Sequence, residues 1–205
     1  MSLEVLSIPP TTDRPATGLI VLLHGWGANA QDLAAIVPAL NLPDYQFLLP
    51  NAPFLHPSVW GGKMWYDLES DDYLGLEESQ QLLFEWLASL EGSTGIPLSA
   101  TIVGGFSQGG AMALDVGLNL TLAGLISMSG YMHQTPENIE SPLPSVLIIH
   151  GRKDPVVPLS AAHRLRDYLL RLGAPMQYKE FDMEHEIKPE ALEVVREFIL
   201  VNFPR

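Results

Sequence analysis

The sequence predicts a single α/β domain, residues 1–205, in which helices flank a mostly parallel central sheet. Short, uniformly apolar runs such as Leu19–Leu23 are typical of strands that are buried on both faces of a parallel sheet. These runs alternate with longer segments whose apolar residues recur at helical spacing, as in α/β folds. The chain has the length of one domain and contains no internal repeat or low-complexity linker.

The first half of the chain supplies three of the predicted strands. Residues 3–8 are an expected edge strand that ends in a proline-rich turn, and residues 19–23 and 45–49 are strands on either side of a helix. Asn29 is the expected N-terminal cap of that helix, because its side chain can accept hydrogen bonds from the first backbone N–H groups. The apolar stripe of the helix consists of Leu33, Ile36, Val37 and Leu40.

The second half alternates strands and helices in the same way. Residues 76–90 carry an amphipathic helical stripe, and residues 100–106 are a short buried strand followed by a helix that begins near Ala111. Two further buried strands are expected at residues 122–128 and 145–150. The remaining elements are a helix with Gly173 at its C-terminal end, a last strand and a C-terminal helix, over residues 159–172, 175–181 and 192–199 respectively.

The connection over residues 50–74 is long, punctuated by proline and glycine, and rich in aromatic residues. Connections of this length without regular structure are uncommon in compact domains unless they build a lid or a pocket wall. We therefore expect this segment to form the substrate-side wall of a site, and a well-packed loop without a ligand role is the alternative. The residues expected to contact a substrate are Trp60, Met64, Trp65 and Leu68.

The composition excludes several function classes. The 24 acidic and 11 basic residues give a formal net charge of -13, whose field repels nucleic acid and anionic membrane surfaces. An acidic cluster between Asp67 and Glu78 is interpreted as a solvated face, with a cation site as the alternative. No cysteine is present, so disulfides, thiolate metal sites and a cysteine nucleophile are excluded. Without a signal sequence or a long apolar run, the chain is predicted to be cytoplasmic and to lack a stable membrane anchor.

Residues 105–109 form the motif around which the predicted site is built. Gly105-Phe106-Ser107-Gln108-Gly109 is a G-x-S-x-G sequence between a strand and a helix, the context in which this motif presents a nucleophilic serine. The sharp reversal strains the backbone at the serine and lifts its hydroxyl from the sheet edge. Glycines on both sides leave room for the crossing chains. A glycine-rich turn that binds nothing is the alternative.

Two other glycine-rich sites are excluded by the residues around Ser107. A phosphate-binding P-loop needs Lys followed by Ser or Thr after its second glycine, but Gly110 and Ala111 follow Gly109 here. A dinucleotide-binding fingerprint needs G-x-G-x-x-G, which this segment lacks. The spacing of the glycines therefore favours a nucleophilic serine over a phosphate-binding site.

A serine hydroxyl becomes a good nucleophile only when a base takes its proton, and an acid must orient that base. In folds of this type the three groups follow one another along the chain as serine, acid and histidine. His185 fits this order best because it lies after the last strand, whereas His150 and His163 fall within regular elements and are interpreted as structural. Asp154 is the preferred acid, since it follows a strand in a rigid loop, and Asp182 is its chief alternative.

Backbone N–H groups are needed to bind the oxyanion that forms during acyl transfer. The first is expected from Gln108, the residue after the nucleophile. The second is expected from Trp26, because Gly25 and Gly27 let the loop that carries it pass close to Ser107. A purely hydrophobic role for the Trp26 side chain is the alternative.

Six blocks of the sequence, in order, resemble the α/β-hydrolase family of acyl-protein thioesterases, lysophospholipases and small carboxylesterases. They span nearly the whole chain and are Leu22-Leu-His-Gly-Trp-Gly27, Pro50-Asn-Ala-Pro53, Met64-Trp-Tyr-Asp67, Gly105-Phe-Ser-Gln-Gly-Gly-Ala-Met-Ala-Leu114, His150-Gly-Arg-Lys-Asp-Pro-Val-Val-Pro158 and Met183-Glu-His-Glu-Ile187. The resemblance implies a single-domain α/β-hydrolase fold, no cofactor and often a homodimer. It implies the same site residues, namely the triad Ser107, Asp154 and His185 and the oxyanion donors Trp26 and Gln108.

The sequence departs from the family pattern at two places near the nucleophile. Many members carry Gly-Leu-Gly-Asp where this chain has Gly-Trp-Gly-Ala28, and Glu184 stands where glycine is common before the histidine. Both differences change the surroundings of the serine, so the acyl-length preference of the family is not transferred to this chain.

We predict a serine carboxylesterase that hydrolyses short- to medium-chain carboxylic esters or thioesters through an acyl-enzyme, with no cofactor and no metal. Acyl-protein thioesterase or lysophospholipase activity is the alternative within this class. A non-catalytic module that binds small apolar ligands on a hydrolase fold is the alternative outside it. The expected partners are a small-molecule ester or thioester and, in a homodimer, a second copy of the chain, but no nucleic acid.

Overall fold

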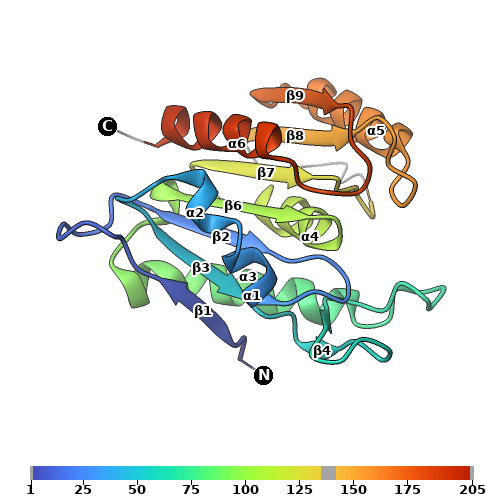
Figure 1. Ribbon diagram of the computed structural model, residues 1–205, viewed down its shortest axis with the longest axis horizontal. Helices are drawn as coiled ribbons and strands as arrows, with labels where there is room; N and C mark the ends of the chain where they lie inside the picture. The colour runs from blue at the N-terminus through green and yellow to red at the C-terminus, as the bar shows by residue number, and fades with distance from the viewer. Residues whose placement is uncertain (1, 135–141, 204–205) are drawn as a thin grey trace.

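The computed structural model describes residues 2–134 and 142–203, and these residues contain a central seven-stranded sheet (Figure 1). The strands lie in the order β1-β3-β2-β6-β7-β8-β9, and every neighbouring pair is parallel except β1 with β3. The predicted mostly parallel sheet with an N-terminal edge strand is thereby confirmed. The bounds are β1 Val5–Ile8, β2 Leu19–Leu23, β3 Gln46–Pro50, β6 Thr101–Phe106, β7 Gly124–Met128, β8 Ser145–Gly151 and β9 Met176–Phe181.

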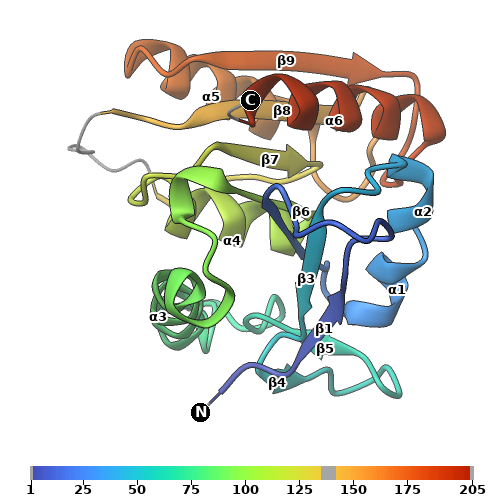
Figure 2. The ribbon, with the colours of Figure 1, turned by 90° about the vertical axis from the view of Figure 1, so that its left-hand side faces the viewer.

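Helices cover both faces of the sheet, as the edge-on view in Figure 2 shows. In strand β2, Leu19, Val21 and Leu23 pack into the apolar core on one face, and Ile20 and Leu22 pack into the core on the other. Burial on both faces explains why this strand is apolar throughout. The first face is covered by α3 (Leu76–Thr94), α4 (Gln108–Gly117) and α5 (Leu159–Arg171), and the second by α1 (Ala30–Ala34), α2 (Val37–Leu40) and α6 (Pro189–Asn202).

The single helix predicted after Asn29 is two short helices in the structure, α1 and α2. The cap is as predicted, since the Asn29 side chain accepts hydrogen bonds from the backbone N–H groups of Gln31 and Asp32. Pro38, in the first turn of α2, accounts for the break. Proline has no N–H to donate, so Pro38 cannot bond to the carbonyl four residues earlier and the hydrogen-bond series of α1 does not continue into α2.

A small antiparallel hairpin organises part of the connection over residues 50–74. Strand β4 (Phe54–Leu55) pairs with β5 (Lys63–Met64), and the pairing closes a turn over residues 56–62. Strands of two residues are too short to show an alternating pattern, which is why the sequence did not predict them. A short 3₁₀ helix, η1 (Leu98–Ala100), likewise precedes β6 without having been predicted.

The acidic cluster lies on the surface. Asp67 is half-buried, and the other five members, Glu69, Asp71, Asp72, Glu77 and Glu78, are exposed to solvent. Within the part of the chain that the structure describes, no group of three or more His, Asp or Glu side chains is arranged to hold a metal ion. None of the described helices combines the length and the apolar character needed to cross a membrane.

Close packing requires glycine at position 109 but not at position 92. A Cβ at Gly109 would lie 2.1 Å from the carbonyl oxygen of Leu23, while a Cβ at Gly92 in α3 would have no neighbour within 4 Å. We expect Gly109→Ala to lower the free energy of unfolding by about 3 kcal/mol. Gly92→Ala is expected to raise it by about 0.5–1 kcal/mol, because alanine favours helix. Denaturant unfolding measures both, and a Gly109→Ala protein as stable as wild type would contradict this packing.

Candidate active site

Ser107 lies at the turn between β6 and α4. Its backbone has φ 55° and ψ −119°, a strained conformation for a residue other than glycine. The chain crosses itself closely there, since a Cβ at Gly105 would lie 2.3 Å from the backbone of Gly109. The Ser107 N–H donates to the carbonyl oxygen of Met128 at 2.8 Å, which ties the turn to β7. The two glycines of the motif thus have the steric role that the sequence predicted for them.

His185 connects Ser107 to Asp154 through two hydrogen bonds. Its Nε2 lies 2.9 Å from the Ser107 Oγ, and its Nδ1 lies 2.7 Å from the Asp154 Oδ2. A carboxylate only accepts, so Nδ1 carries the ring proton and Nε2 is free to accept the proton of the hydroxyl. Ser107, Asp154 and His185 follow β6, β8 and β9, so the carboxyl ends of parallel strands bring them together.

Asp154 has a partner for each carboxylate oxygen. Its Oδ1 accepts the backbone N–H groups of Val156 and Val157, each at 2.8 Å. Burial opposes the charged form, but the hydrogen bonds from His185 and the two amides outweigh burial and hold the pKa of Asp154 below its usual value. Asp154 is therefore charged and accepts the Nδ1 proton of His185. Asp182, the alternative acid, forms an ion pair with Lys153 on the surface instead.

Two other histidines downstream of Ser107 have partners of their own. The buried His150 donates from Nε2 to the carbonyl oxygen of Val157 at 2.9 Å. The Nδ1 of His133 lies 2.6 Å from an oxygen of Asp115, and both side chains are nearly enclosed. Neither histidine has a hydrogen bond to the serine hydroxyl, so neither competes with His185 for it.

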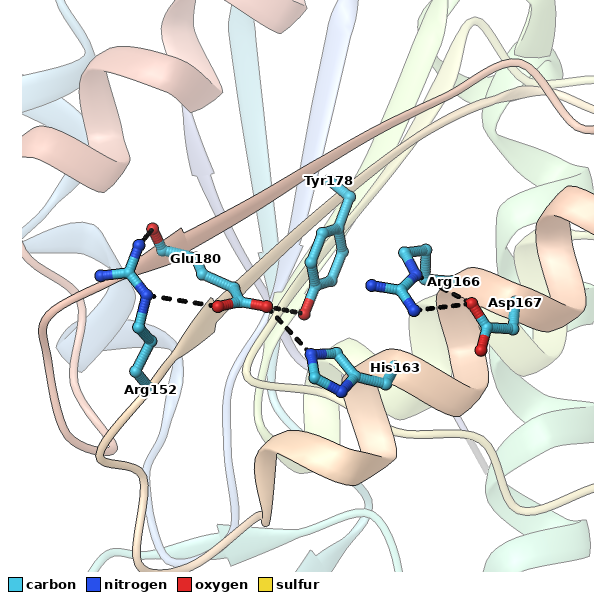
Figure 3. Close-up of polar contacts among 6 residues, drawn as sticks. All are labelled: Arg152, His163, Arg166, Asp167, Tyr178 and Glu180. Atoms are coloured by element: carbon cyan, nitrogen blue, oxygen red, sulfur yellow. Dashed lines mark hydrogen bonds and ion pairs between the residues drawn. The ribbon is translucent and has the colours of Figure 1, made fainter.

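His163 belongs to a polar cluster that Figure 3 shows between α5 and β9. Its Nε2 lies 2.9 Å from the Oε1 of Glu180, which also accepts the hydroxyl of Tyr178 at 2.9 Å. Arg152 donates to the second carboxylate oxygen at 3.2 Å. The bonds from His163 and Tyr178 lower the pKa of Glu180. This cluster ties the edge strand β9 to α5, and β7 and β8 separate it from β6.

The loop over residues 24–28 lies against the nucleophile turn. A Cβ at Gly25 would lie 3.4 Å from the Ser107 Cβ, so the two segments are in direct contact. The backbone N–H of Trp26 has no acceptor among the described residues. The N–H of Gln108 stands at the first position of α4, where helices leave N–H groups unpaired. Both predicted donors are therefore unengaged; Gln108 follows Ser107 in the chain, and Trp26 follows Gly25, which contacts Ser107.

His24 braces this loop, a role that the sequence did not predict. The Ala52 N–H donates to its Nε2 at 3.0 Å, so Nδ1 carries the proton and donates it to the Gly25 carbonyl at 2.8 Å. The indole N–H of Trp65 donates to the His24 carbonyl at 3.1 Å. Burial lowers the pKa of His24 and favours the neutral ring. The loop therefore starts from a buried and fully bonded residue.

The four residues expected to contact a substrate lie in different environments. Trp60 is fully exposed in the hairpin turn, Leu68 is partly exposed, and Met64 is half-buried in β5. Trp65 has no exposed surface, and so it backs the wall from inside the core. This placement differs from the expectation that Trp65 meets a substrate, because an aromatic residue in a loop has the same sequence signal whether it points inward or outward.

The Gln108 side chain joins the nucleophile turn to the wall. Its Oε1 accepts the Trp65 N–H at 2.9 Å, and its Nε2 donates to the Tyr66 carbonyl at 2.8 Å. The Tyr66 hydroxyl lies 2.6 Å from that of Tyr131. Burial raises the pKa of both phenols, that of Tyr131 to about 12, so both stay protonated. Partners 43 and 42 positions apart in the chain left no local signal for these contacts.

Comparison with known proteins identifies the family. The family described as phospholipase/carboxylesterase matches residues 8–202. The chain belongs to this family. The match covers both predicted oxyanion donors and the hydrogen-bonded series from Asp154 to Ser107, and it confirms the resemblance drawn from the six sequence blocks.

Individual proteins align with almost the whole chain. Acyl-protein thioesterase 1 of Neurospora crassa is 31% identical, and the alignment covers 98% of this chain and 92% of that protein. Acyl-protein thioesterase 1 of Saccharomyces cerevisiae is also 31% identical, with 91% and 93% covered. The crystal structure of esterase PE8 matches with a TM-score of 0.91 and 32% identity, covering 99% of this chain and 100% of that chain. These similarities confirm the α/β-hydrolase fold.

The buried neutral ring of His24 predicts a pH dependence of stability. The unfolded chain takes up a proton at His24 near the ordinary histidine pKa of 6.5, but burial opposes that proton in the folded protein and lowers the pKa there. The free energy of unfolding therefore falls as the pH drops below about 6.5. We expect His24→Asn to be less stable at neutral pH but to lose less stability on acidification than wild type. Denaturant unfolding across this range measures both, and identical pH dependences would contradict neutral burial.

Proposed function

We propose that this protein is a serine carboxylesterase that hydrolyses short- to medium-chain carboxylic esters or thioesters through an acyl-enzyme. One observation carries the proposal: hydrogen bonds run from Asp154 through His185 to a strained Ser107. Two unengaged backbone N–H groups support it, that of Gln108, next to Ser107 in the chain, and that of Trp26, next to a glycine in contact with Ser107. Membership of the phospholipase/carboxylesterase family and the similarity to esterase PE8 support hydrolysis of an ester or thioester.

The first half-reaction forms the acyl-enzyme. The Ser107 Oγ attacks the acyl carbonyl carbon while the His185 Nε2 takes the hydroxyl proton. The carbonyl oxygen becomes an oxyanion, which accepts hydrogen bonds from the N–H groups of Trp26 and Gln108, each worth roughly 3–4 kcal/mol of transition-state stabilisation. Asp154 stabilises the imidazolium. When the carbonyl re-forms, the bond to the leaving alcohol or thiol breaks, and His185 returns the proton to the leaving oxygen or sulfur.

The second half-reaction releases the acyl group. His185 takes a proton from water, whose oxygen attacks the carbonyl carbon of the acyl-enzyme. A second oxyanion forms in the same place and collapses, which breaks the bond to Ser107 and returns the proton to its Oγ. The product is the carboxylic acid, which ionises at neutral pH. Every proton in the cycle thus passes through the His185 Nε2.

A second candidate is acyl-protein thioesterase activity, which the names of the Neurospora crassa and Saccharomyces cerevisiae relatives favour. Lysophospholipid hydrolysis is the third, since the family description includes phospholipases. The formal net charge of -13 repels anionic head groups and ranks neutral esters and thioesters above lysophospholipids.

Hydrolysis of p-nitrophenyl butyrate tests the proposed roles of the site residues. Asp154→Asn is expected to lower kcat by about 10⁴-fold, because an amide favours the wrong tautomer of His185. Asp182→Asn is the matched control and is expected to keep the wild-type kcat, since Asp182 forms a surface ion pair with Lys153. Equal rates from wild type and Ser107→Ala would contradict the esterase proposal and favour the ligand-binding alternative.

A series of p-nitrophenyl esters of increasing acyl length, together with acyl thioesters of matched length, measures the substrate class. We expect kcat/KM to be highest for short and medium chains and to fall for long ones. A maximum at long-chain thioesters would instead favour the acyl-protein thioesterase candidate.

A further inference from the structure

We infer that His56 is a positioning residue that holds the backbone N–H of Trp26 in place to bind the oxyanion. The inference rests on the proposed function and extends it to a residue outside the series of Ser107, His185 and Asp154. His56 lies in the hairpin turn between β4 and β5, and only 9% of its surface is exposed. Its ring contacts both the turn and the loop that carries Trp26.

The imidazole of His56 organises its own turn. Its Nδ1 accepts the backbone N–H groups of Ser58 and Val59, each at 3.1 Å. The His56 N–H donates to the Gly62 carbonyl at 2.9 Å, which closes the turn. Because Nδ1 accepts, the ring proton lies on Nε2. The ring is thereby held in one orientation, with the Nδ1 edge toward the turn.

The other edge of the imidazole faces the oxyanion loop. The ring centroids of His56 and Trp26 lie 4.2 Å apart with an interplanar angle of 65°, an edge-to-face arrangement. A Cβ at Gly27 would lie 3.4 Å from the His56 Cδ2, so the ring also covers the next residue. His56 Nε2 and Trp26 Nε1 are both buried, and neither has a hydrogen-bond partner among the described residues. The contact between His56 and Trp26 therefore depends on packing of the two rings and not on a hydrogen bond.

The hairpin also holds the loop through its backbone. The Gly27 N–H donates to the Lys63 carbonyl at 2.9 Å, and the Lys63 N–H donates to the Ala28 carbonyl at 2.8 Å. A Cβ at Gly62 would lie 2.5 Å from the Gly27 carbonyl oxygen, so only glycine allows this approach. A misplacement of about 1 Å can cost roughly 100-fold in rate. The ring and the strand thus both hold the loop that carries the Trp26 N–H.

Three substitutions at His56 distinguish the effect of ring packing on Trp26 from the effect of Nδ1 as an acceptor in the turn. His56→Ala removes both and is expected to lower kcat by about 10- to 100-fold, with KM changed by less than about twofold. His56→Phe keeps a ring over Trp26 and is expected to stay within about threefold of the wild-type kcat, since packing is retained. His56→Asn keeps an acceptor for the turn but no ring, so it is expected to behave like His56→Ala.

An oxyanion mimic distinguishes positioning from a general loss of structure. An alkyl trifluoromethyl ketone forms a hemiketal oxyanion with Ser107, and its affinity is expected to fall in step with kcat/KM across the variants. The affinity of the matching alcohol, which forms no oxyanion, is expected to stay unchanged. Gly62→Ala, which displaces the same loop but keeps the imidazole at position 56, is expected to lower kcat at constant KM. Ser58→Ala keeps the N–H that His56 accepts and serves as the wild-type-like control.

Several results would overturn the inference. If His56→Asn kept the wild-type kcat and His56→Phe did not, the hydrogen bonds in the turn, and not the ring, would account for the loss of kcat in His56→Ala. A change in KM alone would make His56 a substrate contact, and a melting temperature that falls in proportion to kcat would make it merely structural. An active wild type whose kcat survives both His56→Ala and Gly62→Ala would overturn this inference alone. A wild type without esterase activity would overturn the proposed function, and this inference with it.

Discussion

The contact between the nucleophile turn and the end of β2 is the constraint on which the site depends. At Gly109, in the first turn of α4, a Cβ would lie 2.1 Å from the carbonyl oxygen of Leu23 and 2.5 Å from that of His24. Any side chain there would push the helix away from the strand. The same contact brings the N-terminus of α4 next to the loop over residues 24–28, so the two proposed oxyanion donors lie on segments that touch. The absence of a side chain at position 109 is therefore needed both for packing α4 on the sheet and for the geometry of the site.

Buried polar groups outside the serine motif stabilise this arrangement. His24 and the side chain of Gln108 each bridge two backbone segments, and both are fully buried. Hydrogen bonds are stronger in such surroundings than in water, and an unpaired group there is costly. These bonds consequently favour one placement of the oxyanion loop and of the wall before a substrate arrives, which is what electrostatic stabilisation of a transition state requires.

The fold and the positions of the candidate catalytic residues were predictable because each has a local signal. The strands are short apolar runs, Ser107 lies in a motif between a strand and a helix, and Asp154 follows a strand in a loop bounded by glycine and proline. Asp154 and His185 are 31 positions apart, yet the rule that parallel strands end at one edge of the sheet was enough to bring them together.

The supporting contacts could not be predicted because they join distant residues through atoms with no sequence pattern. His56 packs on Trp26 only because a hairpin of two-residue strands lies against the oxyanion loop. Trp65 looks like any aromatic residue in a proline-rich loop, but its indole N–H is bonded to His24 in the core. The break before α2 did have a signal, Pro38, which the regular apolar spacing outweighed.

Covalent labelling with an alkyl fluorophosphonate tests whether Ser107 is a nucleophile that His185 activates. The Ser107 Oγ would bond to phosphorus as fluoride leaves, and intact-mass measurement with peptide mapping would count and locate the adducts. We predict a single adduct, on Ser107, that forms far more slowly in His185→Gln, because the base that takes the hydroxyl proton is gone. Labelling at another residue, or at an unchanged rate without His185, would contradict it.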